Sequence, residues 1–397
     1  MQSPLSPTKT DHARSARASL CALYFFAFTS TYVWTIFPRT LETIGWSGAA
    51  VGILYSARKA VDIPSMWLWG ALADRFNRKR IIQVQLGVGL LASIALATFL
   101  RQDQLMVASL LLFSASAASV FPIADSLTIS KLGPDAYGFV RSFGSAGYAA
   151  MALAAAVVGI SAQNHDAFSL FAIPFLLTII IASLVFSFFI PNVDTAPRKS
   201  SVPLVAQNLS LLTQPGFVFL LVIGALHWAC QTPLNLFLVA LCEHHNLPTW
   251  SPGLGIFIGV SFEVLILAIS KPLLKRLPSS IWLAISILTG VFRWYLMGHA
   301  DTALSMMLLQ ALHGITFGAF FMAAIAMVIS HVPEDQRSSG QAMFYLSVFG
   351  FGSIIGNLIA GPAFDSYGVV TIFEFASFAE FALLIPSVLF AWRTITR

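Results

Sequence analysis

The sequence predicts an all-α membrane protein with twelve transmembrane helices in two pseudo-symmetric six-helix bundles. Of its 397 residues, 57% are hydrophobic and only 10% are charged, and the mean hydropathy is +0.80. The apolar residues form runs of about 20 residues, the length of a helix that crosses a bilayer. These runs lack the alternation typical of barrel strands, and a helix in lipid satisfies its own backbone hydrogen bonds.

The predicted spans fall into two sets of six. A polar connector over 192–215 separates the sets, which suggests a duplicated architecture of the kind found in many secondary transporters. We therefore expect bundles at 18–191 and 216–392, with tails at 1–17 and 393–397. The twelve spans lie near 18–38, 49–72, 81–100, 104–130, 141–162, 167–190, 216–241, 252–271, 279–299, 302–331, 340–363 and 368–392.

The distribution of basic residues predicts the topology. Only Arg39 and Arg101 lie in predicted outer loops, whereas most of the 22 Lys and Arg residues lie in segments on the other side. Because Lys and Arg are retained in cytoplasmic loops, both termini are expected in the cytoplasm of a bacterial inner (plasma) membrane. The net charge of +5 follows from this topology, so no nucleic-acid partner is expected.

The sequence contains no recognisable metal, redox or enzymatic motif. The three cysteines, Cys21, Cys230 and Cys242, are too few and too scattered for a disulfide framework. His244 and His245 are adjacent, and neighbouring side chains on a loop rarely bind one ion without further ligands. No nucleophile, base and orienting group stand at a familiar spacing, so we expect neither a cofactor nor an enzyme.

Ionisable residues inside the predicted spans are the strongest functional signal. A charge at the bilayer centre costs about 2.5–3.5 kcal/mol on insertion scales, so such residues usually serve a function. Arg58 and Asp62 are four residues apart and can form an ion pair on one helix face. Lys59 points about 100° away, which favours a hydrated cavity wall over a purely structural pair.

Four further polar residues lie near the middles of four different spans: Glu263, Arg293, His313 and His227. A network of these groups could bind or release a proton when a cation moves away from a carboxylate or imidazole. A static hydrogen-bonded core is the alternative, and His227 beside Trp228 could simply pack. We expect Glu263 or His313 to titrate. The residues expected to couple protons are Glu263, Arg293, His313, Arg58, Asp62 and His227.

Two groups of residues in the N-terminal half suggest substrate binding. Asp125 and Arg141 come from adjacent spans and could clamp a hydroxylated or anionic solute, or form a structural latch. Tyr24, Phe28 and Tyr32 recur every four residues and form an aromatic stripe, which could serve for packing or line a pocket. The residues expected to bind substrate are Asp125, Arg141, Tyr148, Glu263, Tyr24, Phe28, Tyr32 and Trp228.

Small residues recur at helical spacing in the fifth and eleventh spans, which predicts close helix approach. Such a face could rock during transport or simply pack tightly. The residues are Gly144, Gly147, Ala150, Ala154, Gly350, Gly352, Gly356 and Gly361.

The segment "GALADRFNRKR", residues 70–80, resembles the signature loop between the second and third helices of the major facilitator superfamily, G-x-x-x-D-R-x-G-R-K-R. Asn77 replaces the usual glycine, and we expect it to keep the turn by adopting a left-handed backbone. The resemblance implies a cytoplasmic gate in which the aspartate pairs across a helix interface. The matching residues are Gly70, Asp74, Arg75, Arg78, Lys79 and Arg80.

A narrower likeness covers nearly the whole chain. "ALYFFAFTSTYVWTIFP", "YGFVRSFGSAGY", "LTGVFRWYLMG" and "ALHGITFGAF" resemble the branch that contains lactose permease and the phenylpropionate permeases, proton-coupled importers of small organic solutes. The resemblance implies that Asp125 and Glu263 are carboxylates of the substrate site and that Arg141 is the arginine partner of Asp125. It also implies roles for Arg293 and His313 in the same site.

Three positions depart from lactose permease. Tyr148 stands where that protein has a tryptophan that stacks on sugar. Thr316 and Gln310 stand where it has a glutamate and a lysine of its proton route. That route therefore cannot be carried over as a whole.

Together these observations predict a secondary active transporter that works by alternating access, with its site between the two halves. The expected reaction is proton-coupled uptake of a small organic solute such as an aromatic acid or a sugar. Its partners are the solute, protons and the lipid bilayer, and the protein is expected to be a monomer. The alternatives are a proton-driven exporter of drugs or metabolites and a transport-inactive membrane sensor.

Overall fold

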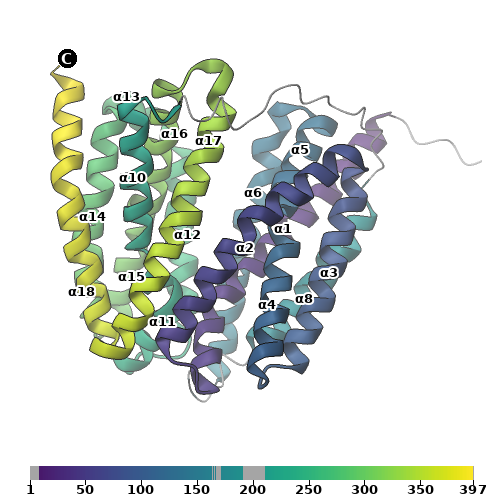
Figure 1. The fold of residues 1–397 in the computed structure, drawn as a ribbon, viewed down its shortest axis with the longest axis horizontal. Coiled ribbons are helices and arrows are strands. Elements are labelled where there is room, and N and C mark those ends of the chain that lie inside the picture. Colours follow the sequence, from purple (N-terminus) through teal and green to yellow (C-terminus); the bar gives the residue numbers. More distant parts are fainter. Residues whose placement is uncertain (1–8, 163, 165, 167–170, 191–210, 397) are drawn as a thin grey trace, which may run out of the picture. The chain divides into compact units, whose positions relative to one another are not determined.

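The computed structural model describes residues 9–162, 164, 166, 171–190 and 211–396. Within these residues the regular elements are helices and no strand is present (Figure 1). The all-α prediction is confirmed, as expected for a backbone that must satisfy its own hydrogen bonds in lipid. Much of the predicted tail at 1–17 and of the connector at 192–215 lies outside the described residues.

The helices of the first half follow the predicted spans with two differences. Helix α1 begins at Lys9, so the described part of the predicted tail is helical. The span predicted over 104–130 is divided at Ala118 and Ser119. The helices are α1 (Lys9–Thr43), α2 (Gly48–Arg75), α3 (Arg78–Thr98), α4 (Asp103–Ala117), α5 (Val120–Leu132), α6 (Pro134–Ser161) and α8 (Ala172–Phe188).

The helices of the second half are more often interrupted. The seventh span breaks at Cys230 and Gln231, just before Pro233, which lies in the first turn of the next helix, where its missing N–H is tolerated. The tenth and eleventh spans each contain a π-helix. The elements are α10 (Pro215–Ala229), α11 (Thr232–His244), α12 (Ser251–Ala268), α13 (Ser270–Arg276), α14 (Ser279–Gly298), α15 (Ala303–Ala311), π-helix η1 (Gly314–Ala319), α16 (Phe320–His331), 3-10 helix η2 (Glu334–Gln336), α17 (Arg337–Tyr345), π-helix η3 (Leu346–Gly352) and α18 (Ser353–Ile395).

Nine helical segments of the described chain are long and apolar enough to cross a membrane. One of them, Ser339–Ile395, holds both the eleventh and twelfth predicted spans, which are divided at Gly368, whose φ of 82° suits glycine. The second predicted span lies on the charged helix α2, and the sixth on the 17-residue helix α8. Each predicted span therefore lies, over most of its described residues, in helix.

The described helices group into two compact units, each with its own apolar core. In the first unit, Leu20, Ile82 and Leu127 are completely buried, and in the second unit Phe217 and Phe320 are. The predicted boundaries of the two bundles stay a prediction, because parts of α1, α2 and α6 group with the second unit. The first unit comprises described residues within 9–34, 60–151 and 171–190, and the second within 35–59, 152–166 and 211–396.

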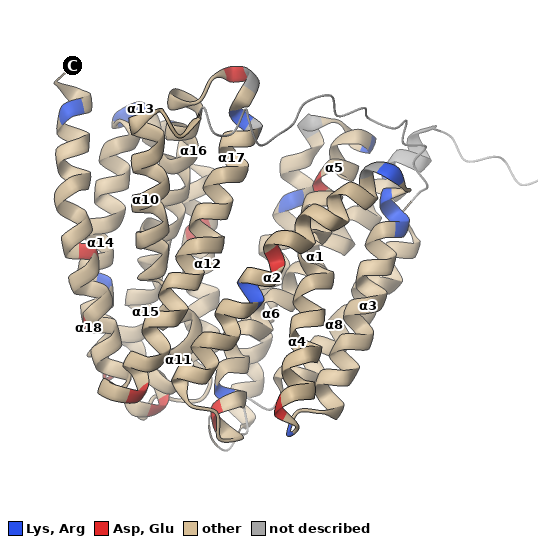
Figure 2. Ribbon diagram, in the orientation of Figure 1, with Lys and Arg blue, Asp and Glu red and all other residues tan. Residues whose placement is uncertain are grey.

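Lys, Arg, Asp and Glu residues lie mostly near the ends of the helices (Figure 2). Few Lys, Arg, Asp and Glu residues occur midway along the helices of either unit. Desolvation explains this pattern, because a charge in the hydrocarbon region needs a partner or water. The few mid-helix charges therefore identify the positions that require a functional explanation.

Glycines allow close helix contacts in both units, which confirms the predicted close approach. In the first unit, Gly147 on α6 lies against the backbone of Phe25 on α1. In the second unit, a Cβ at Gly48 on α2 would lie 2.8 Å from the carbonyl oxygen of Gly361 on α18. Van der Waals contact between such close backbones stabilises helix pairs in lipid, where apolar burial contributes little.

The N-terminus of α2 is capped by a residue far away in the sequence. The carboxylate of Asp365 on α18 accepts hydrogen bonds from the backbone amides of Gly48 at 2.7 Å and Ala49 at 2.8 Å. The first amides of a helix have no partner within it, and its N-terminal end carries a partial positive charge. Asp365 therefore fixes the start of α2 against α18.

We predict that Asp365→Ala destabilises the second unit. Losing a carboxylate cap typically costs about 1 kcal/mol. For a chain of this size the apparent Tm in detergent should fall by about 1–2 °C. Asp301→Ala, at an exposed position before α15, is the control and should leave the Tm unchanged. Equal Tm values for the two variants would contradict a capping role.

Candidate functional site

Two clusters of polar side chains inside the helices, one in each unit, contain most of the residues that the sequence predicted to bind substrate or couple protons. A polar group that is removed from water must find hydrogen-bond partners, so their arrangement is constrained. The first we call the Asp125 cluster, which consists of Tyr24, Phe28, Phe121, Asp125 and Arg141. The second we call the Arg293 cluster, which consists of His227, Gln231, Glu263, Arg293, Gln310, His313, Thr316 and Glu380.

The Asp125 cluster joins a carboxylate, a guanidinium and aromatic rings. The Tyr24 hydroxyl donates a hydrogen bond to Asp125, and Arg141 Nε lies 3.8 Å from Asp125 Oδ1. The Arg141 guanidinium stacks 4.0 Å above the centre of the Phe28 ring. The side chains of Arg141 and Asp125 remain 34% and 29% exposed, so a solute could reach them. The structure thus brings together the two residues predicted to clamp substrate.

The predicted aromatic stripe on α1 packs against α5 and α6. Phe28 contacts Phe121 with ring centres 3.8 Å apart, and Tyr32 meets Tyr148 edge to face at 5.6 Å. Tyr24 and Tyr32 are almost completely buried. These rings therefore form the wall beside Asp125, and Phe28 is the member that also contacts the Arg141 guanidinium.

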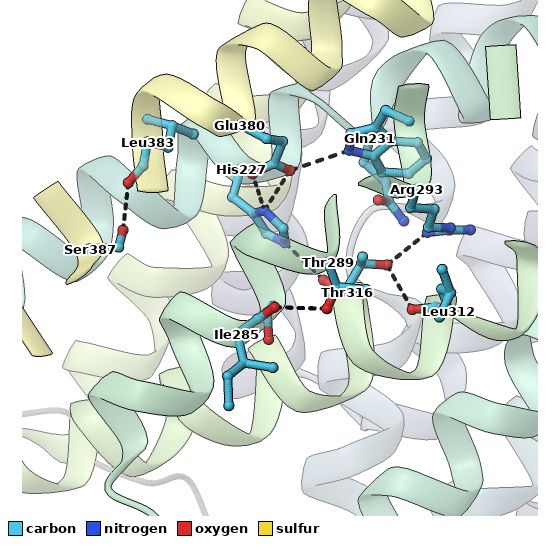
Figure 3. Close-up of polar contacts among 12 residues, drawn as sticks. His227, Gln231, Ile285, Thr289, Arg293, Leu312, Thr316, Glu380, Leu383 and Ser387 are labelled. Carbon is cyan, nitrogen blue, oxygen red and sulfur yellow. Dashed lines mark hydrogen bonds and ion pairs between the residues drawn. The ribbon is translucent and has the colours of Figure 1, made fainter. Parts of the chain in front are cut away.

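Arg293 on α14 is completely buried and is held by neutral acceptors (Figure 3). Its Nη1 donates to the hydroxyl of Thr316 at 2.7 Å, and its Nη2 donates to Gln310 Oε1 at 2.9 Å. Its Nε donates to the carbonyl of Leu309 at 3.2 Å. The guanidinium also lies 4.5 Å from the Trp294 ring centre. A buried cation is costly, so these acceptors are needed to keep the side chain in place.

One histidine–carboxylate pair lies beside Arg293 and is partly open. His313 Nε2 lies 3.3 Å from Glu263 Oε2, and the two side chains are 16% and 15% exposed. The other ring nitrogen, Nδ1, lies 3.2 Å from the amide nitrogen of Gln231 and 3.5 Å from Arg293 Nη1. The structure therefore brings together three residues that the sequence predicted: Glu263, Arg293 and His313.

A second histidine–carboxylate pair is closed. His227 Nδ1 lies 2.7 Å from Glu380 Oε1 and 3.0 Å from Oε2, and the two side chains are 2% and 0% exposed. His227 Nε2 lies 2.8 Å from the carbonyl oxygen of Thr316. The indole of Trp294 donates to Glu380 Oε1 at 3.3 Å. Thr316 thus contacts Arg293 through its hydroxyl and His227 through its carbonyl.

Local backbone features make room for these side chains. Gly290 on α14 faces Glu380, and a Cβ there would lie 2.8 Å from Glu380 Oε1. Gly259 on α12 leaves similar room for His313. Thr316 lies in the π-helix η1, a wide-turn element that is frequent at functional sites. These deviations from regular helix indicate that the cluster constrains the backbone around it.

Several residues of the cluster are not among those that the sequence predicted, or have another role in the structure. Glu380, the buried partner of His227, was not proposed, although a lone carboxylate in the apolar run "FASFAEFALL" is a signal. Gln231 carried no signal of its own. Gln310 and Thr316 were read as losses from a proton route, whereas in the structure they are the acceptors of Arg293.

Other predicted residues lie outside the two clusters. Arg58 is buried, with its guanidinium 4.9 Å from the ring centre of Tyr55, and Lys59 and Asp62 are partly buried on the same helix. The ion pair between Arg58 and Asp62 stays a prediction. Trp228 donates to Ser353 Oγ at 2.8 Å and packs at the edge of the Arg293 cluster, since its ring contacts Phe317, which stacks on His313.

The predicted gating loop keeps its turn by another means than expected. Asn77 has φ −64° and ψ 118°, so the left-handed backbone that we expected is wrong. Instead, its side chain caps α3 by accepting a hydrogen bond from the amide of Arg80 at 3.3 Å. Lys79 Nζ donates to the carbonyl of Phe188 at 2.9 Å. The side chain of Asp74 lies outside the described residues, and gating stays a prediction.

The two adjacent histidines of the segment 242–248 are His244 and His245, and His245 makes a structural contact. His245 Nε2 lies 2.8 Å from the carbonyl of Gly298. Among the residues that the structure describes, no group of three or more His, Cys, Asp or Glu side chains could hold a metal ion.

Comparisons with known proteins identify the family. The model of the MFS_1 like family matches residues 17–375. The uncharacterized transporter YwbF of Bacillus subtilis is 22% identical over 92% of each chain. The maltose permease of Geobacillus stearothermophilus is 22% identical over 94% of this chain and 93% of its own.

The fold agrees with this assignment. The crystal structure of the D323A mutant of the nucleoside transporter NupG superposes with a TM-score of 0.84 at 17% identity, covering 94% of this chain and 99% of that one. The assignment to the lactose permease and phenylpropionate permease branch stays a prediction. The chain is thus a multi-pass integral membrane protein with the all-α major facilitator fold, a secondary transporter of small solutes that belongs to the MFS_1 like family.

Proposed function

We propose that this protein takes up a small polyhydroxylated solute, a nucleoside or a sugar, together with protons, by alternating access. The observation that carries the proposal is the buried Arg293, which contacts one histidine–carboxylate pair directly and a second through Thr316. A cation in this position changes the proton affinity of both pairs when it moves. Such linked changes in charge are what proton coupling requires.

The Asp125 cluster supports the choice of solute class. A carboxylate accepts hydrogen bonds from hydroxyl groups, and a guanidinium donates to ring oxygens or to carbonyl groups. The Phe28 ring beside them offers an apolar face for a sugar or a base. Relatives named for maltose and for nucleosides support the same class, and an aromatic acid, which the sequence also suggested, fits the guanidinium and the aromatic wall.

The roles divide between the clusters. Asp125, Arg141 and Tyr148 bind the solute, with Tyr24 and Tyr32 holding them in place. Glu263, His313 and Arg293 contribute to binding and couple it to proton movement, and His227 joins them. The protein works as a monomer in a bacterial inner membrane with both termini in the cytoplasm, where the segment from Gly70 to Arg80 gates access.

The central test is proton-driven uptake by the full-length protein in liposomes. A thermal-shift screen with nucleosides, maltose and aromatic acids first finds solutes that bind, because a ligand bound only by the folded state raises the Tm. Labelled hits should then accumulate when the outside is more acidic than the inside, and a protonophore should abolish accumulation. Extrusion under the opposite gradient would instead favour the exporter, and binding without flux would favour the sensor.

We predict that Asp125→Asn weakens solute binding. The substitution keeps the shape of the side chain but removes the charge, which is worth about 1.5–3 kcal/mol per hydrogen bond to a charged group. The apparent Kd from thermal-shift titration should rise about 10- to 100-fold. Asp301→Asn, at an exposed position, is the control. An unchanged Kd for Asp125→Asn would remove Asp125 from the binding site.

A third variant tests the position of the buried cation. Arg293→Lys keeps the charge but cannot donate to Thr316, Gln310 and the Leu309 carbonyl at once. We expect proton-driven uptake to fall about 10- to 100-fold, in line with the loss of charge-assisted hydrogen bonds. Arg101→Lys, at an exposed position in the turn between α3 and α4, should transport like the parent. Normal uptake by Arg293→Lys would show that charge alone suffices.

A further inference from the structure

The two histidine–carboxylate pairs of the Arg293 cluster differ in the number of protons that their hydrogen bonds require. We infer that the closed pair His227–Glu380 holds the transported proton. The partly open pair His313–Glu263 carries only the one ring proton of a neutral imidazole. This inference rests on the proposed function, and it replaces the expectation that Glu263 or His313 titrates. It follows from counting donors and acceptors at each ring nitrogen.

At His313, both neighbours of Nδ1 are donors. A guanidinium can only donate, and Arg293 Nη1 faces this nitrogen at 3.5 Å, as does the Gln231 amide nitrogen at 3.2 Å. Nδ1 must therefore present its lone pair, and the ring proton lies on Nε2, directed at Glu263. The carboxylate of Glu263, as an anion, accepts the hydrogen bond from this N–H group. His313–Glu263 then carries one negative charge, which balances Arg293.

At His227, both ring nitrogens face acceptors. The Thr316 carbonyl oxygen, 2.8 Å from Nε2, can only accept, so Nε2 carries a proton. On the other side, Nδ1 lies 2.7 Å from Glu380 Oε1. Without a second proton, a nitrogen lone pair would face an anion at this distance in a site closed to water. One further proton must therefore lie between Nδ1 and the carboxylate, and the pair is neutral when it is present.

Few ionisable groups face this pair. In the described part of the chain these are Arg293 on α14 and the Cys230 thiol at the end of α10. The Phe320 ring of α16 covers the imidazole at 4.7 Å, and η3, which packs against α10, has no ionisable side chain. The other ionisable groups of the packed elements do not contact the pair. They include His331 on α16, Glu243 and His244 on α11, Arg337 and Tyr345 on α17, Tyr295 on α14, and Asp365, Tyr367, Glu374 and Arg393 on α18.

Thr316 connects the proton site to the cation. When the pair His227–Glu380 releases its proton it becomes an anion, and the nearby charge of Arg293 stabilises that state. A solute that draws the guanidinium away from Thr316, or neutralises it, removes this stabilisation and favours the protonated pair. Linkage is reciprocal, so the proton in turn favours solute binding. The pair would therefore load its proton together with the solute and release it when the solute leaves.

A solute-free measurement tests the proton count directly. The full-length protein in lipid nanodiscs, labelled with ¹⁵N-histidine, is studied by NMR at neutral pH, with His227→Gln and His313→Gln assigning the two rings. Infrared spectra of the parent and Glu380→Gln report protonated carboxyl groups. We expect His313 as a neutral ring with its proton on Nε2. For His227 we expect either a ring protonated on both nitrogens or a protonated carboxyl band that Glu380→Gln removes.

Two results would overturn the inference. One is a neutral His227 ring together with no carboxyl band that depends on Glu380. The other is a His313 ring protonated on both nitrogens. Because no solute is present, these results stand whether or not transport is proton-coupled. If His227→Gln fails to fold, the comparison with Glu380→Gln and the assignment of His313 still decide how many protons each pair carries.

Transport by matched variants is the second test of the inference. Glu380→Gln keeps the shape of the side chain and an acceptor oxygen but cannot take up or release a proton. It should therefore lose gradient-driven accumulation of labelled maltose or nucleoside. Exchange of labelled for unlabelled solute should be retained. Glu374→Gln is the control, since Glu374 lies on the same helix and pairs with the exposed His299 at 3.3 Å. Glu263→Gln should weaken binding but keep the dependence on the gradient.

The outcomes separate the inference from the proposed function. If the parent protein shows no gradient-driven accumulation, the proposed proton coupling fails. If the parent is coupled and Glu380→Gln is equally coupled, only the proton assignment fails. Loss of coupling with retained exchange in Glu263→Gln, but not in Glu380→Gln, would move the proton to the open pair.

Discussion

The buried positive charge of Arg293 constrains the side chains around it in the second unit. Removing a guanidinium from water costs several kcal/mol even after relaxation, so its surroundings must supply acceptors in fixed places. The acceptors come from Gln310 on α15, Thr316 in η1 and the Leu309 carbonyl. Two elements, α15 and η1, are thereby fixed around one side chain of α14, so a displacement of that side chain changes the hydrogen bonds of both.

The neighbouring carboxylates are arranged so that they do not simply neutralise Arg293 by contact. Its direct partners are neutral acceptors. Glu263 is linked to it through His313, and Glu380 is linked to it through His227 and Thr316. A direct ion pair would be strong and hard to break. An indirect arrangement leaves the guanidinium able to exchange one neutral acceptor for another, or for a solute, at a smaller cost. This suits a transporter, which must release what it binds.

Much of the fold, and part of the site, could be predicted from the sequence because the relevant physics is local. Apolar runs of membrane length mark helices wherever they occur, and the cost of a charge in lipid singled out Glu263, Arg293 and His313. The pairing of His227 with Glu380 joins residues 153 positions apart, which no local pattern encodes. The replacement of a left-handed turn by a side-chain cap at Asn77 was equally hidden, because asparagine suits both.

The π-helix η1 has a mechanical consequence for the carrier. A π-turn contains one residue more than an α-turn, so tightening η1 into α-helix would rotate the chain beyond it by about 100° relative to the chain before it. His313 precedes this element and Thr316 lies within it. A change of helical pitch at a single turn would therefore uncouple the two histidine sites from each other, without any bending of the helices that contain them.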